Sequence, residues 1–427
     1  MEKLTINNFL IIKKAEIDVK RINIIIGPQA NGKSLVAKIL NFCKTLGLDF
    51  IEGVQENKSK RELDNKILKE FEERFPRYTW EGTSFDIKYQ FEDIEFNLVG
   101  RKSSKQNKTT ISIRYSDNLA RIFVAKKKIF QKKLDERRKS NSLKAGRKSV
   151  FYEEGIFYEN VVNSLRRGEY SSFFMNGFFI PASRSFFANL QKNIFSFLAS
   201  NLDIDPYLKE FGKDYENAKR WYKSDFMQKR LDSKNANDIH RVIEQIIAGD
   251  YEFSDEQDWI IGKQGSRINL ANASSGQQES LPMLITLYSL PIMNNEDDDA
   301  MCFIEEPEAH LFPTSQGHVV SIISQLYATT QLNFFMTTHS PYIISAINNF
   351  ILASDKVRAG LISIEEFRTI NGSGIPIRYE DVAAYSIENG VTVNICDDDY
   401  RLVGAGMLDK IGDHYESVMH DLLARGE

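Results

Sequence analysis

Hydrophobic and polar positions in the first 47 residues predict a strand-to-helix unit. Residues 3–9 and 15–20 alternate with the period of two that is typical of half-buried strands, and residues 22–26 form a short apolar run. From Lys33 onward, apolar residues recur at helical spacing up to Gly47, which suits the C-cap of a helix. We therefore expect two strands, a buried strand, a glycine loop and a helix, in this order.

The chain after residue 250 alternates between helical and strand-like patterns. Helical spacing covers 279–290 and 314–330, and the stretches 300–306 and 332–339 begin as apolar runs that end in polar residues. Buried strands that alternate with helices favour a parallel sheet covered on both faces. The predicted fold class is α/β, with a mixed, largely parallel sheet and additional antiparallel strands near the N-terminus.

The pattern is weaker between the two ends of the chain. It predicts a charged helix at 60–75, strands within 85–115, a basic helix at 124–139, a strand that breaks at Pro181, and several helices within 186–247.

These patterns divide the chain into three parts. Residues 1–100 and 251–427 form the two halves of a sheet domain, and the latter half ends in a helix expected at 411–423. Residues 101–250 form an inserted basic and helical arm, which includes the strand near 173–182. The insertion is too short and irregular for long coiled-coil arms.

The net charge of −4 conceals a strong asymmetry. The segment 101–150 holds 17 lysines and arginines against three acids, a local charge of about +14. Such a basic segment on an acidic body suits binding of nucleic acid or of an acidic protein through 101–148. The alternative is a solvated helix face without a ligand.

Composition narrows the class of protein. The hydrophobic fraction of 42% and charged fraction of 27% are those of an ordinary soluble protein. No apolar run approaches the roughly 20 residues of a membrane-spanning helix, and the start lacks the features of a signal peptide. Three scattered cysteines (Cys43, Cys302 and Cys396) indicate neither a disulfide framework nor a Cys/His zinc site. We expect a cytoplasmic protein without a membrane partner.

The sequence GPQANGKS, from Gly27 to Ser34, fits the phosphate-binding loop G-x-x-x-x-G-K-[ST]. It follows an apolar strand and opens a helix, which is the context that the motif requires. Its backbone N–H groups and the helix dipole favour phosphates, Lys33 reaches the β- and γ-phosphates, and Ser34 is a ligand for Mg²⁺. The predicted cofactors are ATP and Mg²⁺, and the candidate binding residues here are Gly27, Asn31, Gly32, Lys33 and Ser34. The alternative is a glycine turn at a helix start.

Carboxylates crowd the end of the strand at 300–306. A divalent cation would stabilise them, with Glu305 holding Mg²⁺ through water and Glu306 polarising the water that attacks the γ-phosphate. Acids also favour the start of a helix, which could explain Glu308. We assign no catalytic role to Glu308.

Two more segments carry polar groups suited to phosphate. NASSGQQES places Ser274, Ser275 and Gly276 just before a helix, where they either bind phosphate or cap the helix. FFMTTHSP ends a strand with His339, whose imidazole could contact the γ-phosphate or could be structural.

These four motifs, in this order, resemble the ATP-binding-cassette (ABC) type of ATPase. IEEPEAHLFP and TTHSP are more closely similar to the OLD-like (AAA15) group, which is related to the heads of Rad50, RecF and SMC proteins. The resemblance is concentrated in 1–47, 178–185 and 265–345. It implies a homodimer that sandwiches two ATP molecules, in which the signature Ser274–Gly276 faces the partner's phosphates. It also implies that Glu305 and Glu306 are the Walker B pair and that His339 is the switch histidine.

The chain departs from the family pattern at three places. Glu305 replaces an aspartate, and Phe312 stands at the position of the D-loop aspartate. No Q-loop glutamine is evident, and the candidates for its place are Ser183, Arg184 and Gln191.

The resemblance also suggests a role. Stand-alone OLD-like ATPases resemble the ATPase subunits of two-gene anti-phage systems of the PARIS and Septu types, of which we favour PARIS. In these systems the ATPase controls a separate effector, commonly a nuclease. The chain lacks a Toprim glutamate motif, and we interpret Asp397–Asp399 as an acidic turn, so no nuclease site of its own is expected. The alternatives are a DNA-binding ATPase of repair or chromosome maintenance, like RecF or Rad50, and a transporter cassette.

Overall fold

The structure is a computed structural model of the 427-residue chain. It describes residues 1–103, 108–140, 148–190, 204–222, 233–294 and 298–404, together with the isolated positions 199, 224, 231, 417 and 419; the side chains of 137–140, 148–152 and 233 are excepted. The candidate Gln191 and the helix predicted at 411–423 therefore lie outside what is described, apart from the two isolated positions.

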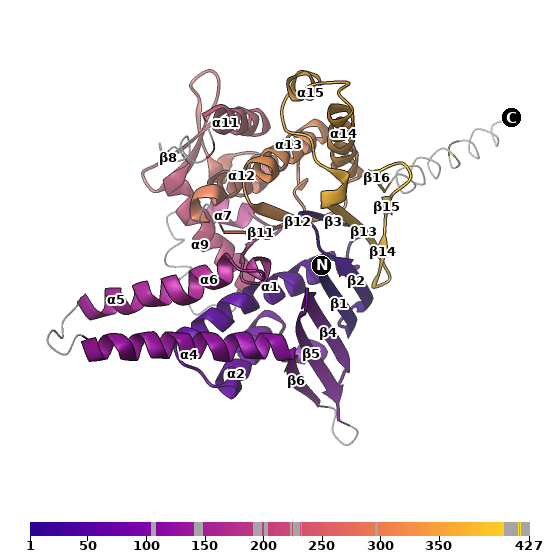
Figure 1. The fold of residues 1–427 in the computed structure, drawn as a ribbon. Coiled ribbons are helices and arrows are strands. Elements are labelled where there is room, and N and C mark those ends of the chain that lie inside the picture. The colour runs from indigo at the N-terminus through magenta and orange to yellow at the C-terminus, as the bar shows by residue number, and fades with distance from the viewer. Residues whose placement is uncertain are drawn as a thin grey trace.

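An eleven-stranded sheet forms the centre of the molecule (Figure 1). Its order is β6 (Thr109–Tyr115), β5 (Ile94–Lys102), β4 (Phe85–Phe91), β1 (Glu2–Phe9), β2 (Ile12–Asp18), β14 (Val391–Asn394), β13 (Val382–Glu388), β3 (Ile22–Ile26), β12 (Leu332–Thr338), β11 (Ala300–Glu305) and β7 (Asn176–Ile180). The strands from β13 to β7 are parallel, and those from β6 to β2 are antiparallel. The predicted mixed sheet is confirmed, and β7 ends directly before Pro181 as expected.

Helices cover both faces of the sheet. Alternate residues of β3 point to opposite sides, so that Ile24 joins one hydrophobic core and Ile25 the other. The helices are α1 (Lys33–Gln55), α2 (Lys60–Arg74), α3 (Arg77–Trp80), α4 (Asp117–Ser140), α5 (Lys148–Phe157), α6 (Asn163–Arg166), α7 (Ser185–Leu190), α9 (Pro206–Trp221), α11 (Ser233–Ile247), α12 (Ser275–Met293), α13 (Pro313–Thr329), α14 (Pro341–Arg358) and α15 (Ile364–Asn371). Residues of α1 pack in the core of Ile25, and residues of α9, α11, α12, α13 and α14 pack in the core of Ile24.

Two small sheets complete the described part of the chain. One consists of β10 (Arg267–Asn269), β9 (Gln257–Ile261) and β8 (Asp250–Ser254), and the other of β15 (Cys396–Asp397) and β16 (Leu402–Val403). None of the helices described is both long enough and apolar enough for a membrane span.

The helix predicted to end at Gly47 continues to Gln55, so the C-cap prediction was wrong. Gly47 lies inside α1, and a Cβ at this position would approach the Phe173 carbonyl oxygen to 2.4 Å. The glycine therefore permits close packing of the helix on a distant segment. Sequence spacing could not show this, because the contact partner lies more than 120 residues away.

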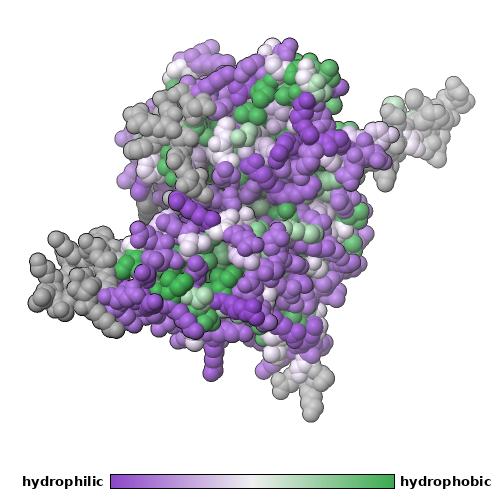
Figure 2. All heavy atoms as spheres, viewed as in Figure 1, coloured by the Kyte–Doolittle hydropathy of each residue, from purple (hydrophilic) through white to green (hydrophobic). Residues whose placement is uncertain are grey.

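The predicted basic helix is part of α4, which projects beside α5 as a two-helix arm (Figure 1). Leu119, Phe123, Phe130 and Leu134 of α4 are buried. Arg121, Lys128 and Lys132 are exposed at the helical spacing i, i+7, i+11, and we call them the basic stripe. Figure 2 shows hydrophobic surface over the arm as well.

Candidate ATP-hydrolysis site

The candidate site lies at the carboxyl edge of the parallel strands β3, β12 and β11. Glu305 pairs with Thr337 across β11 and β12, and Thr338 pairs with Ile26 across β12 and β3. The segments that follow these strands therefore meet. Ligands of open α/β sheets bind at this edge.

The loop Gly27–Ser34 needs its two glycines for different reasons. A Cβ on Gly27 would lie 2.4 Å from the Ile387 carbonyl oxygen of β13. Gly32 has φ 97°, which side chains disfavour, and its Cβ would lie 2.4 Å from Ile12. Asn31 braces the loop, since its Oδ1 accepts a 2.8 Å hydrogen bond from the N–H of Asn389. The braced loop leads into the N-terminus of α1, where anions are favoured and Ser34 is exposed.

Lys33 connects the phosphate-binding loop to His339, which directly follows the adjacent strand β12. Its Nζ donates to the carbonyl oxygens of Gly27 at 2.8 Å and Pro28 at 2.9 Å, and it lies 3.1 Å from His339 Nδ1. Burial lowers the pKa of the Lys33 ammonium, and the carboxylates of Glu306 and Glu308 oppose this shift. The loop lysine and the predicted switch histidine are thus brought together.

His339 in turn contacts the predicted general base. Its Nε2 lies 3.1 Å from Glu306 Oε1. Because an ammonium only donates, Nδ1 must accept from Lys33, and a neutral His339 therefore carries its proton on Nε2 and donates it to Glu306. The line Lys33–His339–Glu306 therefore joins the segments that follow the three strands, and it gives the Glu306 carboxylate one hydrogen-bond donor, His339 Nε2.

Glu305 fits the predicted Mg²⁺ role. Its side chain is buried at the end of β11, where Oε2 accepts a 3.1 Å hydrogen bond from the Ala182 N–H. Oε1 is also buried and has no hydrogen-bond partner among the described residues. A buried carboxylate oxygen without a donor is costly unless a cation meets it. The donor set of Glu305 and the Ser34 hydroxyl consists of oxygen atoms, which Mg²⁺ prefers.

Glu306 and Glu308 take different positions after the strand. Glu306 has φ 45°, a conformation that non-glycine residues seldom adopt and that occurs at functional sites. Glu308 Oε1 accepts from Thr338 Oγ1 at 2.8 Å and from the His339 N–H at 2.6 Å. Glu308 therefore fixes the end of β12 and the backbone of His339. The helix-cap interpretation of Glu308 was wrong.

Arg184 links the Walker B acids to the signature helix. The side chain is fully buried, and its guanidinium donates to the carbonyl oxygens of Glu305 at 2.7 Å and Glu306 at 3.0 Å. Its Nε donates to the Glu279 carbonyl oxygen of α12 at 2.9 Å and lies 3.6 Å from the Glu279 carboxylate. That carboxylate also accepts from the N–H groups of Arg184 and Ser185. Sequence analysis proposed Arg184 only as a replacement for the Q-loop glutamine, and it did not identify Glu279.

The signature segment begins α12. Ser274 is the N-cap and forms a capping box with Gln277, and Ser274 and Ser275 are exposed. A Cβ on Gly276 would lie 2.8 Å from the carbonyl oxygen of His310, so this glycine permits contact with the loop after the Walker B acids. No hydrogen bond joins Ser274–Gly276 to Gly27–Ser34 within the described part of the chain.

Two further sequence predictions can be placed. Phe312 is 73% exposed at the N-cap of α13, six residues after Glu306. Asp397 Oδ1 accepts from the N–H groups of Asp399 and Tyr400, the pattern of an acidic turn.

Comparison with protein families matches residues 180–344 to the AAA ATPase domain. The matched range contains Arg184, the signature segment, the Walker B acids and His339, and it begins after the phosphate-binding loop. The match covers less than half of the chain and indicates an ATPase domain in that part of it. The glycine loop with Lys33 lies outside the matched range.

Solved structures with a similar fold are distant in sequence. The SMC head domain from Thermotoga maritima is 11% identical, with 92% of this chain and 97% of that chain covered and a TM-score of 0.37. An SMC head bound to the C-winged helix domain of ScpA is also 11% identical, with coverage of 92% and 96% and a TM-score of 0.38. The comparison with curated proteins found no match.

Proposed function

We propose that the chain is an ATP-hydrolysing switch that closes as a head-to-tail homodimer around two ATP molecules and controls a separate effector. The observation that carries the hydrolytic part is the line Lys33–His339–Glu306 beside the buried carboxylate of Glu305. At one edge of the sheet it places a lysine that can bind phosphate, a histidine that contacts both neighbours, and a carboxylate that can accept a proton.

Each residue of the candidate site has a separate role in the proposed hydrolysis of ATP. The loop amides and Lys33 bind the β- and γ-phosphates, and the exposed Ser34 hydroxyl and Glu305 hold Mg²⁺, which neutralises phosphate charge. Glu306 orients the attacking water and accepts its proton. His339, placed between Lys33 and Glu306, can donate its Nε2 proton either to Glu306 or to a γ-phosphate oxygen, so that the position of the base depends on nucleotide.

The proposed dimer rests on the exposure of Ser274 and Ser275. Ser274 caps the Gln277 N–H, but the N-terminus of α12 is exposed, and its positive dipole end favours an anion. Because no hydrogen bond joins Ser274–Gly276 to its own phosphate-binding loop among the described residues, we assign this segment to the phosphates of the partner's site.

Complementation tests this composite site. Lys33→Ala and Ser274→Arg should each abolish hydrolysis, the first by removing phosphate charge and the second by blocking closure. Mixed in equal amounts, they should recover up to roughly a quarter of wild-type ATPase activity, because half of the dimers hold one intact site. Coupling between the two sites would lower this value but not abolish the recovery. Steady-state phosphate release from the single variants and from the mixture measures this recovery.

Ser363→Arg is the matched control for loss of a helix cap. Ser363 is the N-cap of α15 and forms the same type of capping box, with Glu366, away from the candidate site. Ser363→Arg should retain hydrolysis. A mixture that stays inactive, while both variants remain folded, would contradict sites shared between protomers.

The effector role rests on the arm and on the resemblance to anti-phage ATPases. The basic stripe faces outward on α4, and Val124 and Ile129 of the same helix are also exposed. Charge together with exposed apolar side chains favours an acidic protein partner, such as a nuclease effector. The second candidate is a DNA-binding ATPase of the RecF or Rad50 kind, which the basic stripe alone favours.

Affinity purification of Glu306→Gln from the native host, with ATP and Mg²⁺, distinguishes these candidates. We expect a stoichiometric second polypeptide that survives nuclease treatment, and its loss when Lys128 and Lys132 are also changed to glutamate. The charge change should leave basal ATPase activity of the wild-type background intact. Nucleic acid alone, released at high salt, would support the DNA-binding ATPase and contradict the effector role.

A further inference from the structure

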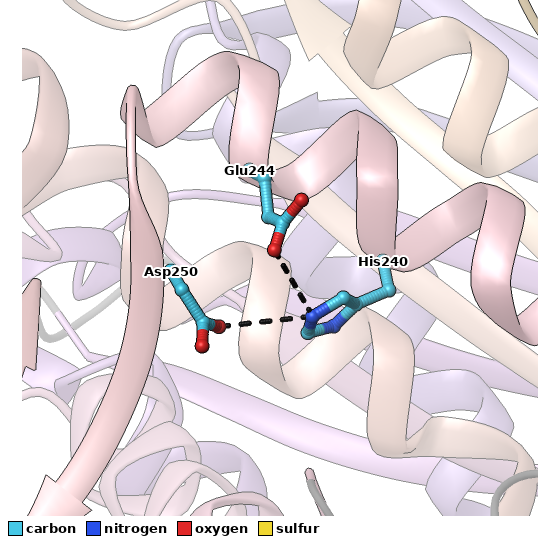
Figure 3. Close-up of side chains that lie close together, drawn as sticks. All are labelled: His240, Glu244 and Asp250. Carbon is cyan, nitrogen blue, oxygen red and sulfur yellow. Dashed lines mark ion pairs between the residues drawn. The ribbon is translucent and has the colours of Figure 1, made fainter. Parts of the chain in front are cut away.

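We propose that His240, Glu244 and Asp250 form a binding site for a divalent transition metal, with Zn²⁺ the ion best suited. The three side chains lie away from the ATP-hydrolysis site, at the end of α11 and the start of β8, and their donor atoms lie within 4.8 Å of one another. Figure 3 shows that His240 Nε2 faces both carboxylates.

The helix-to-strand turn brings the three groups together. His240 and Glu244 are one helical turn apart on α11. Ala248 then takes a φ of 54°, and the Gly249 N–H donates to the Glu244 carbonyl oxygen at 3.1 Å, which folds the chain back at once. A Cβ on Gly249 would lie 2.7 Å from the Ile261 carbonyl oxygen, so the turn also requires this glycine. Asp250 consequently returns beside Glu244.

The distances suit ligands of one ion. His240 Nε2 lies 3.4 Å from Glu244 Oε1 and 3.7 Å from Asp250 Oδ1. A charge-assisted hydrogen bond from a protonated histidine would be shorter, about 2.7–2.9 Å. Ligands at about 2.0–2.2 Å from a tetrahedral ion are separated by roughly 3.3–3.5 Å. The separations are therefore closer to those of ligands around a four-coordinate ion than to those of direct hydrogen bonds.

Tyr222 supplies the outer support that a metal-bound histidine usually has. Its buried hydroxyl oxygen lies 3.0 Å from His240 Nδ1, and its ring centroid lies 5.4 Å from that of the imidazole. With Nδ1–H donating to the tyrosine oxygen, the lone pair of Nε2 points to the carboxylates. One nitrogen and two carboxylate oxygens suit Zn²⁺, and the partial exposure of all three side chains leaves the fourth position to water.

The site is also joined to the signature segment. Ile247, three residues from both Glu244 and Asp250, accepts a 2.7 Å hydrogen bond from Gln277 Nε2 through its carbonyl oxygen. Gln277 is the capping-box partner of Ser274. An ion that ties α11 to β8 would therefore stiffen the turn on which the signature helix start rests.

Titration of ZnCl₂ into the full chain without nucleotide tests the site. Calorimetry should show one saturable site per chain that His240→Ala and Asp250→Asn each weaken about tenfold or more, with Tyr222→Phe also weakening it about tenfold. His318→Gln on α13 is the matched histidine control, and Glu305→Gln is the control for the Walker B acids; both should bind Zn²⁺ like the wild type.

Thermal unfolding provides a second measurement that does not depend on ATPase activity. Zn²⁺ should raise the Tm of the wild type, because the ion binds the folded state, and should not raise that of Asp250→Asn. Equal Tm values without metal would show that the variant folds. Unchanged Zn²⁺ affinity in His240→Ala, or no saturable binding to the wild type, would overturn the site.

Discussion

Glu306→Gln is expected to bind ATP like the wild type and to hydrolyse it roughly 10²–10⁴-fold more slowly, the usual contribution of a general base. The amide keeps the size of the side chain and can still accept from His339 Nε2, but it cannot take a proton from water. Single-turnover hydrolysis and equilibrium ATP binding separate the two effects. Slow turnover should also trap the closed dimer, which light scattering would detect.

Glu308→Gln is the matched control two residues along the chain. Glu308 Oε1 accepts from the Thr338 hydroxyl and from the His339 N–H, and an amide oxygen can accept both hydrogen bonds. Glu308→Gln should therefore lose much less ATPase activity than Glu306→Gln. Normal turnover in Glu306→Gln would place the base elsewhere, and equal losses in both variants would indicate that Glu306 acts only by position.

Arg184→Met should lower the free energy of unfolding by about 3–5 kcal/mol, the cost of breaking a buried ion pair from one side. The guanidinium is 0% exposed, and its loss leaves the Glu279 carboxylate without its cation and four carbonyl oxygens, those of Pro181, Glu279, Glu305 and Glu306, without their charged donor. Urea unfolding followed by circular dichroism measures the change. ATP hydrolysis should fall as well, because Arg184 holds the backbone of both Walker B acids.

Arg358→Met is the control for this substitution. Arg358 and its partner Glu380 are both exposed, with side chains 58% and 49% accessible, so the expected change is below about 1 kcal/mol. Arg184→Met combined with Glu279→Gln should recover part of the lost stability, because the buried charge of Glu279 is then removed together with its cation. Additive losses in the double variant would refute a direct coupling between the two side chains.

Much of the sheet could be predicted because its signals are local. The loop GPQANGKS follows the apolar strand β3 and opens α1, and strand and helix periods mark β1, β11 and β12 within a few residues. The end of α1 could not be predicted in the same way. Gly47 looks like a helix end in sequence, but its lack of a side chain serves a contact with Phe173.

The motifs of the candidate site could be predicted from the sequence, but the contacts between their side chains could not. Lys33 and His339 are separated by 306 positions, and Arg184 and Glu279 by 95, so only the fold shows that they touch. Arg184 carries no signal of its own because a lone arginine after a strand is usually exposed. Glu279 sits within a helical pattern whose other residues are mostly apolar, and an acid buried there is a clue that a cation lies nearby.

The fully buried Arg184 has a consequence for how the two nucleotides would influence each other. Arg184 ties the backbone of the Walker B acids to the signature helix of the same chain, so that both move as one unit. In the proposed dimer that unit touches both ATP molecules, one through its acids and the other through Ser274. ATP binding at one site would then increase the affinity of the other site, which is positive cooperativity. The two hydrolysis events should likewise not be independent.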